Sequence, residues 1–459
     1  MAALIDHSPK EARSGWNVQP QGWPFARSAP KAAGGGLHRI IEPGATFERI
    51  RPFFNRVGIT RIANITGLDR VGIPVYSAIV PRSRDLISVY NGKGFTMMDA
   101  KTGAVMEAVE RFAASRDRLP DEVASYRELS RQAAVIDPRS INTPLHPNYT
   151  DDTPVAWLKG IDLLSGRATL VPHGLACFYG LAYPWQSCHA VTSTNGLASG
   201  NSIEEAACHA LAEVIERDAH SIMDVIARQI LVVGNHLPWL GQTRAEQLAR
   251  ERRLLYPAID LDSLPERPAH LVQCFRAAGL EPLLQYAGSE CGAATIVCLV
   301  HEDITNKFSQ AHHGLGTDPN PTVAVVRALT EVAQSRAVDI QALREDLTAV
   351  GEQVGQHMQH ANRSGEVNKD YWYSNSHRIA LSSIRGQSTT DILDDIRIML
   401  SGLRAEGIEH CVMVDLSVPE IPAKVVRIIA PGLESWIVDH GKVGERAKAH
   451  WREFAARVQ

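Results

Sequence analysis

The feature that most constrains the fold is a helical pattern that occurs three times in this 459-residue chain. Each copy has small residues seven and three positions before a central glutamate, and a second polar group three positions after it. That spacing places all four positions on one helical face. The polar groups of the three copies, in chain order, are Glu107 with Glu110, Glu213 with Glu216, and Glu331 with Gln334. The pattern predicts helices over 99–114, 203–227 and 323–343.

These acids suggest a cation site. One such helix alone is most simply explained as a solvated acidic face, because Glu is a common exposed helix former. Three copies with alanine beside the acids favour close approach of another group. Converging carboxylates repel one another unless cations lie between them. Hard oxygen ligands from several helices suit Mg²⁺, which keeps some waters and uses substrate phosphates to complete its octahedron.

A glycine-bearing segment precedes each helix, and we expect these segments to be turns that offer backbone N–H groups to phosphate. Ordinary turns are the alternative, since none matches GxxxxGK[ST] or GxGxxG. Lys93 could add a positive charge, and Arg327 is spaced to bind a phosphate oxygen or to form a structural ion pair with Glu331. The residues of interest in the first two segments are Gly92, Lys93, Gly94, Asn195, Gly200 and Asn201.

Composition excludes several classes of protein. The 47 Lys+Arg and 51 Asp+Glu residues form no long run of one sign, so a nucleic-acid partner is not expected. The longest apolar run, roughly 293–300, falls short of the ~20 residues of a membrane helix, and the N-terminus does not resemble a signal peptide, so we expect a cytoplasmic protein. Seven cysteines without CxxC indicate reduced thiols. Cys177, Cys188 and Cys208 could carry persulfide sulfur, although packing is the commoner role.

The remaining pattern predicts an α+β protein. Further helices are expected at 243–255 and 392–405, and the strands of mixed sheets at 73–80, 86–90, 168–171, 295–300, 411–416 and 425–430. Residues 1–36 are rich in Pro, Gly and Ala and are expected to form a flexible N-terminal extension. The folded region is then 37–459, with a strand-turn-helix segment at about 410–459 packed on it.

The combined motifs resemble the YcaO family from about residue 38 to the end of the chain. They are Gly-Lys-Gly followed by A-x-x-x-A-φ-x-E-x-φ-E-R, then T-N-G-x-x-x-G-N with a second E-x-φ-E-R helix, then R-A-L-T-E-x-x-Q-x-R. The resemblance implies a YcaO-type fold with inward-facing glutamates around an ATP site. It also implies an enzyme that uses ATP and Mg²⁺ to phosphorylate a peptide-backbone amide oxygen after a nucleophile attacks the carbonyl carbon.

The resemblance also implies residue roles. The Mg²⁺ ligands would be Glu107, Glu110, Glu213 and Glu216. Arg327 and Glu331 match a nucleotide-binding pair of the family, with Gln334 one turn later, and these three are the candidate catalytic residues. Upstream, Arg39 and Thr46 resemble a basic residue and a hydroxyl that approach the nucleotide. The chain departs from the family at Gly103 and His209, where a hydroxyl and an amide are common.

Three short segments and the C-terminus suggest a branch of the family. The segments 58–61, 66–69 and 427–434 are similar to members that pair with a TfuA-type protein and exchange amide oxygen for sulfur, and the proline-rich tail common in azoline-forming members is not seen. The implied partners are a peptide or protein substrate, a TfuA-like protein and sulfide or a sulfur carrier. An azoline-forming cyclodehydratase and a non-catalytic Mg·ATP-binding scaffold remain alternatives, and a homodimer is one option for the assembly.

Overall fold

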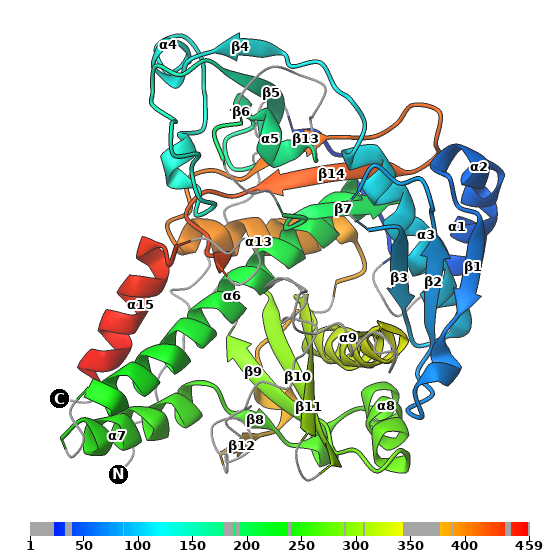
Figure 1. The fold of residues 1–459 in the computed structure, drawn as a ribbon, viewed down its shortest axis with the longest axis vertical. Helices are drawn as coiled ribbons and strands as arrows, with labels where there is room; N and C mark the ends of the chain where they lie inside the picture. Colours follow the sequence, from blue (N-terminus) through cyan, green and yellow to red (C-terminus); the bar gives the residue numbers. More distant parts are fainter. Residues whose placement is uncertain are drawn as a thin grey trace.

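Three sheets organise the chain, which the computed structural model describes at 23–32, 39–85, 87–178, 187–189, 193–236, 240–288, 291–305, 308–342, 377–387, 389–436 and 442–457. In these residues every strand pair is antiparallel except β8 with β12 (Figure 1). The N-terminal sheet has the order β1-β2-β3, the lower sheet β11-β10-β9-β8-β12, and the upper sheet β4-β5-β13-β14-β7 with β6 on β5. This arrangement confirms the expected α+β class with mixed sheets.

The strands of the three sheets have the following bounds. The N-terminal sheet contains β1 (Arg61–Asn64), β2 (Val75–Ile79) and β3 (Val89–Lys93). The lower sheet contains β8 (Ala258–Ile259), β9 (Leu283–Gly288), β10 (Ala294–Thr305), β11 (Phe308–Asp318) and β12 (Arg378–Ile379). The upper sheet contains β4 (Glu122–Ala124), β5 (Val155–Asp162), β6 (Ala168–Pro172), β7 (Leu197–Gly200), β13 (Val412–Asp415) and β14 (Lys424–Ile429).

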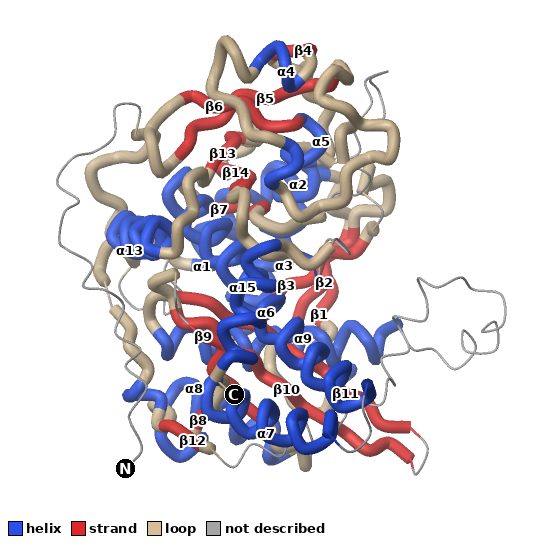
Figure 2. The backbone as a smooth tube through the Cα atoms, turned by 90° about the vertical axis from the view of Figure 1, so that its left-hand side faces the viewer, coloured by secondary structure: helices blue, strands red, loops and turns tan. Residues whose placement is uncertain are grey.

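The longest helix of the described chain, α6 (Ile203–His236), passes between the upper and lower sheets and contacts strands of both (Figure 1). Figure 2 shows the long β10–β11 hairpin running beside α9 (Pro321–Ala342). The other helices are α1 (Pro43–Ile50), α2 (Phe54–Val57), α3 (Met97–Ala114), α4 (Tyr126–Leu129), α5 (His173–Ala176), α7 (Leu240–Leu255), α8 (Glu266–Ala277), α13 (Ile392–Ala405) and α15 (Glu445–Ala456). No helix in the described ranges is long and apolar enough to cross a membrane.

Each of the three acidic helices is preceded by a strand whose glycine packs against that helix. Strand β3 precedes α3, β7 precedes α6, and β11 precedes α9. A Cβ atom on Gly92 would lie 2.0 Å from the carbonyl oxygen of Ala100, and one on Gly316 would lie 2.0 Å from that of Ala324. A Cβ on Gly200 would lie 2.5 Å from the nitrogen of Ala206. The expectation of glycine turns was therefore wrong for most of these segments. The small residues of strand and helix serve close strand–helix packing.

The chain is packed at 23–32, within the segment expected to be a flexible extension. Phe25 and Ala29 are buried beside α6 and α13. The N–H of Ala26 donates to Glu204 Oε1 at 2.8 Å, and Lys31 Nζ lies 2.6 Å from Asp395 Oδ2. For these ten residues the expectation of a flexible segment was wrong. The two polar contacts and the buried aromatic side chain offset the conformational entropy lost when the chain is ordered. Residues 1–22 and 33–36 lie outside the described part.

The glycine contacts predict a stability difference between two Gly→Ala variants. Gly316→Ala should lower the free energy of unfolding by about 1–3 kcal/mol, because the added methyl group overlaps helix backbone that cannot move aside cheaply. Gly67→Ala is the control, since a Cβ there meets nothing within 4 Å, and its effect should stay within about 1 kcal/mol. Urea unfolding followed by circular dichroism measures both. Equal stability of the two variants would contradict the packing account.

Candidate functional site

The glutamates of the three helices are anchored to the strands that precede those helices. The N–H of Asn91 donates to Glu107 Oε2 at 2.9 Å, and the N–H of Leu315 donates to Glu331 Oε1 at 3.3 Å. Glu213 accepts a backbone hydrogen bond from Gly196. The same arrangement thus recurs on α3, α6 and α9. Each central carboxylate is fixed by an N–H group 16 or 17 residues upstream.

The carboxylates from α3 and α6 lie close enough to repel one another. Burial is the largest cause that raises the pKa of Glu110 well above its usual value, and the nearby Glu107 and Glu213 raise it further. Burial also raises the pKa of Glu216 to about 7, with Glu331 and Glu213 adding to the effect. These interactions place acids of α3, α6 and α9 in one electrostatic cluster.

Lys93 connects the N-terminal sheet to α9 through an ion pair with Glu331. Burial raises the pKa of Glu331, but Lys93 and the nearby Arg217 outweigh that effect, so the pKa lies below its ordinary value. Arg327 is instead held at the end of β11. Its Nη1 donates to the carbonyl of Thr317 at 3.1 Å and its Nη2 lies 3.6 Å from Asp318 Oδ2. The alternative of a structural ion pair between Arg327 and Glu331 is therefore not the arrangement found.

Positive charges surround His209 on α6, four residues before Glu213. Burial lowers the pKa of His209 well below its usual value, and Arg327, Arg39 and Lys93 lower it further. These three cations come from α9, the segment before α1, and β3. They were predicted from separate motifs to approach a nucleotide, and the fold brings all three to one helical face. A polyanion is the ligand that such a cluster suits.

Glu205 is a site residue that the sequence reasoning missed. Arg39 Nη1 lies 3.0 Å from Glu205 Oε1, and Asn201 Nδ2 donates to both carboxylate oxygens at 3.2 Å. Glu205 is almost fully buried, because α6 begins just before it. The only sequence signal was the four-residue spacing from Asn201, which many helices share.

The other predicted nucleotide residues have packing contacts in this structure. Gly92, Gly94 and Gly200 pack against backbone atoms or Cβ atoms of the helices that follow them, so these helices cover their Cα atoms. Thr46 is buried on α1, and its hydroxyl donates to the carbonyl of Glu42 at 3.3 Å. Asn195 precedes β7 and its Oδ1 is buried. Gln334 is half-buried on α9. Their roles toward a nucleotide stay predictions.

The acid cluster fits Mg²⁺ by its chemistry. Within the described ranges, no three His, Cys, Asp or Glu side chains are arranged to hold a metal ion as they stand. The predicted ligands are nevertheless all carboxylates; Glu216 is buried and the other three are partly buried, and this loss of hydration raises the pKa of each. A hard divalent cation with part of its shell from water and phosphate would relieve their repulsion without requiring three direct protein ligands. Glu107, Glu110, Glu213 and Glu216 would hold that cation.

Two motifs linked in sequence to a TfuA-paired branch have structural roles here. Asp69 accepts from Arg336 Nε at 2.9 Å, and Arg336 Nη2 also donates to Glu302 at 3.0 Å, which ties the β1–β2 connection to α9. Glu434 accepts from the N–H groups of Gly444 at 2.9 Å and Ala447 at 2.8 Å. It therefore satisfies N–H groups at the start of α15.

Comparison with known families agrees with this site. A family model described as YcaO cyclodehydratase, ATP- and Mg²⁺-binding, matches residues 91–434. The chain therefore belongs to the YcaO family, and ATP and Mg²⁺ are the ligands of this family, as expected. Membership supports an ATP-dependent peptide-modifying enzyme. The match includes all three acidic helices but begins after Arg39 and Thr46.

Relatives and solved structures extend the match over most of the chain. An uncharacterized protein of Methanothermobacter thermautotrophicus is 33% identical over 420 residues, covering 90% of this chain and 99% of the relative. A Rhizobium leguminosarum bv. trifolii protein is described as lying in the tfuA 3' region. It is 31% identical over 406 residues, which cover 86% of this chain and 88% of that protein. YcaO from Methanopyrus kandleri, solved with AMPPCP and Mg²⁺, matches with a TM-score of 0.63 at 22% identity. The match covers 91% of this chain and 99% of the Methanopyrus kandleri chain.

A heterocyclase solved with substrate and cofactor matches with a TM-score of 0.70 at 20% identity. That match covers 91% of this chain and 54% of the heterocyclase chain. At these identities the two solved structures establish the fold alone. Together with the sequence relatives they confirm the predicted YcaO-type fold.

The cysteines considered as sulfur carriers are buried. Burial raises the pKa of Cys177 to about 11 and that of Cys188 to about 12, and it raises the pKa of Cys208 as well. A sulfur carrier needs an accessible thiolate. The structure therefore favours the packing role. Of the seven cysteines, Cys274 is the only one that is not buried.

Thiol labelling tests this conclusion. With the native protein at pH 8, iodoacetamide should modify Cys274 first and leave Cys177 and Cys188 unmodified, because their buried thiols ionise only at much higher pH. Peptide mass spectrometry measures the extent at each site, and unfolding in urea should make all seven react. Rapid labelling of Cys177 or Cys188 in the native protein would show that the thiol is accessible and would contradict the packing role.

Proposed function

We propose that this protein activates a peptide-backbone amide by phosphorylating its oxygen with ATP, and that the product is a thioamide made together with a TfuA-like partner. The observation that supports the ATP chemistry is the convergence of carboxylates from α3, α6 and α9 beside Lys93, Arg39 and Arg327. The acids for a metal ion lie on α3, α6 and α9, and the cations for phosphates come from other segments to the part of α6 around His209. This pairing is what phosphoryl transfer requires.

The reaction solves a leaving-group problem. A peptide amide is a weak electrophile, and oxide cannot leave its carbon. In the proposed sequence, hydrosulfide attacks the carbonyl carbon and forms a C–S bond, the oxyanion takes the γ-phosphoryl group of ATP, and ADP departs. The thiol of the phosphorylated adduct then gives up its proton and the C–O bond breaks. The phosphate departs as hydrogen phosphate with that proton, and the C–S bond becomes C=S. The balance is amide, hydrosulfide and ATP in, and thioamide, ADP and phosphate out.

The chain's own residues would position the reactants. Mg²⁺, held by Glu107, Glu110, Glu213 and Glu216, would neutralise charge on the phosphates. Arg327 is fixed by Thr317 and Asp318, so its guanidinium needs little reordering to meet a phosphate oxygen. Lys93 would exchange part of its contact with Glu331 for phosphate.

The thioamide assignment rests on the neighbourhood of a relative. The Rhizobium leguminosarum protein encoded beside tfuA matches this chain over 86% of its length. Such proximity supports a shared process with a TfuA-like protein. The two branch-linked acids, Asp69 and Glu434, support the fold rather than the chemistry. Contact with the partner would therefore use other surfaces.

Variants of the acids test the ATP chemistry. Glu110→Gln or Glu216→Gln should abolish Mg²⁺-dependent ATP hydrolysis in the presence of substrate, because each removes a carboxylate from the cation site. The fold should persist, since the neutral amide replaces a group whose ionisation burial already opposes. Phosphate release and circular dichroism measure the two effects. Glu122→Gln, an exposed change on β4, is the control. Normal turnover by both site variants would refute the proposal.

Product mass distinguishes thioamide formation from the alternatives. A candidate peptide incubated with ATP, Mg²⁺, sulfide and the TfuA-like partner should gain the mass difference between sulfur and oxygen at one residue. Loss of one water from a Cys, Ser or Thr peptide, with no need for sulfide, would indicate an azoline-forming cyclodehydratase instead. Binding of Mg·ATP without turnover under all these conditions would indicate a scaffold subunit.

A further inference from the structure

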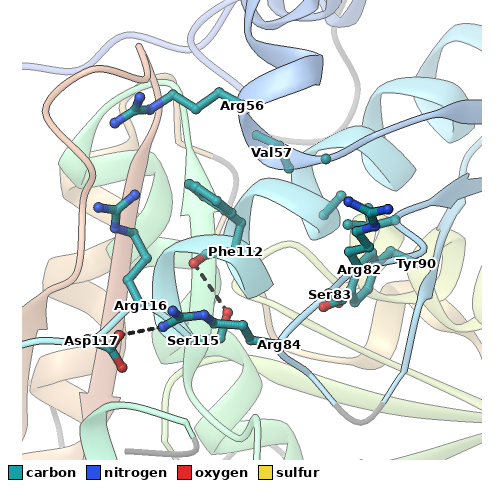
Figure 3. Close-up of a pocket in the computed structure, with 13 residues that line it drawn as sticks. Arg56, Val57, Arg82, Ser83, Arg84, Tyr90, Phe112, Ser115, Arg116 and Asp117 are labelled. Atoms are coloured by element: carbon teal, nitrogen blue, oxygen red, sulfur yellow. Dashed lines mark hydrogen bonds and ion pairs between the residues drawn. The ribbon is translucent and has the colours of Figure 1, made fainter. Parts of the chain in front are cut away.

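An arginine-rich cavity lies at the C-terminal end of α3, away from the acid cluster (Figure 3). Its volume is about 390 Å³, which lies in the range of small-molecule sites. The α3 residues that line it follow helical spacing and occupy the face opposite to Glu110. The lining residues come from α2, the β2–β3 connection and α3, and the charged members are Arg56, Arg82, Arg84, Arg116 and Asp117.

Positive charge dominates the cavity. Its single lining acid, Asp117, pairs with Arg84 at 2.6 Å. Arg56 pairs with Glu420 at 2.7 Å. All four of these side chains are substantially exposed, so each ion pair contributes little to the stability of the fold. In the described part of the chain, Arg82 and Arg116 have no carboxylate partner. The cavity therefore carries an excess of guanidinium groups that an anion could bind.

The arginines are arranged on opposite sides of the cavity. Figure 3 shows Arg82 on one side and Arg56 and Arg116 on the other, with Phe112 between them. The guanidinium carbon of Arg116 lies 5.5 Å from the Phe112 ring centre. An anion in the middle could thus be approached from two directions.

The remaining walls are apolar or carry hydroxyl groups. Val57, Val80, Ala108 and Phe112 supply apolar surface. Tyr90, which is part of the buried core, also lines the cavity, and its hydroxyl lies 2.5 Å from Ser83 Oγ. An inorganic ion would leave the apolar walls unfilled, whereas a neutral apolar molecule would desolvate arginines without compensation. Both parts are satisfied by an anion joined to an apolar body.

Arg111 shows that the cavity is separate from the acid cluster. It is the α3 arginine that faces the cluster, with its Nη1 3.2 Å from Asp85 Oδ2 and its Nη2 3.8 Å from Glu107 Oε1. It does not line the cavity. The four cavity arginines are therefore not used by the proposed Mg·ATP chemistry, and two of them, Arg82 and Arg116, are available to an anion.

We propose that this cavity binds a small organic anion, a phosphate or carboxylate group on an apolar body, at a site distinct from that of ATP. The charged group binds the guanidinium group of Arg82 or Arg116, and the apolar body packs on Phe112 and Val80. The proposal does not depend on the thioamide reaction. It predicts that both the charge and the apolar part of the ligand contribute to affinity.

Calorimetric titration with phenyl phosphate, benzoate and inorganic phosphate tests the proposal. Phenyl phosphate should bind saturably and at least tenfold more tightly than inorganic phosphate. The double variant Arg82→Gln with Arg116→Gln should weaken phenyl phosphate binding at least tenfold. Arg131→Gln with Arg167→Gln removes the same charge from exposed positions outside the cavity and should leave the affinity unchanged. Circular dichroism verifies that both variants are folded.

Three results would overturn the proposal. They are no saturable binding of phenyl phosphate, equal affinity for phenyl phosphate and inorganic phosphate, and undiminished binding in the cavity variant. The last result would place the ligand elsewhere, including the ATP site. Binding of an Asp- and Glu-rich peptide in the absence of any binding by phenyl phosphate and benzoate would identify the cavity as a protein contact and would equally refute a small-anion site.

Discussion

The site depends on the burial of like-charged carboxylates from three helices in one region of the fold. Burial and mutual repulsion both oppose ionisation, as the raised pKa of Glu110 and Glu216 indicates. Such an arrangement lowers stability unless other groups compensate for it. Backbone N–H groups supply part of that compensation at Glu107 and Glu331, and Lys93 supplies more. A divalent cation would supply the rest.

The same structural unit delivers each acid. A strand carrying glycine packs directly on the helix that follows it. The central glutamate accepts a hydrogen bond from an N–H group of that strand in two cases, and from Gly196 in the turn just before β7 in the third. Close strand–helix contact requires the small residues, so glycine and alanine are part of the mechanism that positions the carboxylates. Because α6 lies between two sheets, it can present its acids to the region that Arg39, Lys93 and Arg327 approach from other segments, while most of its surface is buried.

The sequence predicted the elements whose periodicity was strong. The helices α3, α9 and α13 and the strands β13 and β14 were expected close to their observed bounds, because apolar spacing determines them. Helix α6 and strand β10 were also expected, but both extend well beyond the C-terminal ends predicted for them. Strand β7, the end of β3 and the C-terminal half of β11 were expected to be turns, since glycine is normally rare in strands and only the tertiary contact with a helix explains it. Glu205 and the arginine cavity could not be predicted, because their residues meet only in the folded chain.

The central claim is that the glutamates of α3 and α6 surround a divalent cation that coordinates the phosphates of ATP. A crystal structure of the protein with Mn²⁺ and AMPPCP tests it most directly, because the anomalous signal of Mn²⁺ locates the metal independently of the protein chain. The account predicts anomalous peaks within coordination distance of Glu110 or Glu216, directly or through one water, with the triphosphate beside Lys93 and Arg327. Metal and nucleotide bound away from these side chains would contradict it.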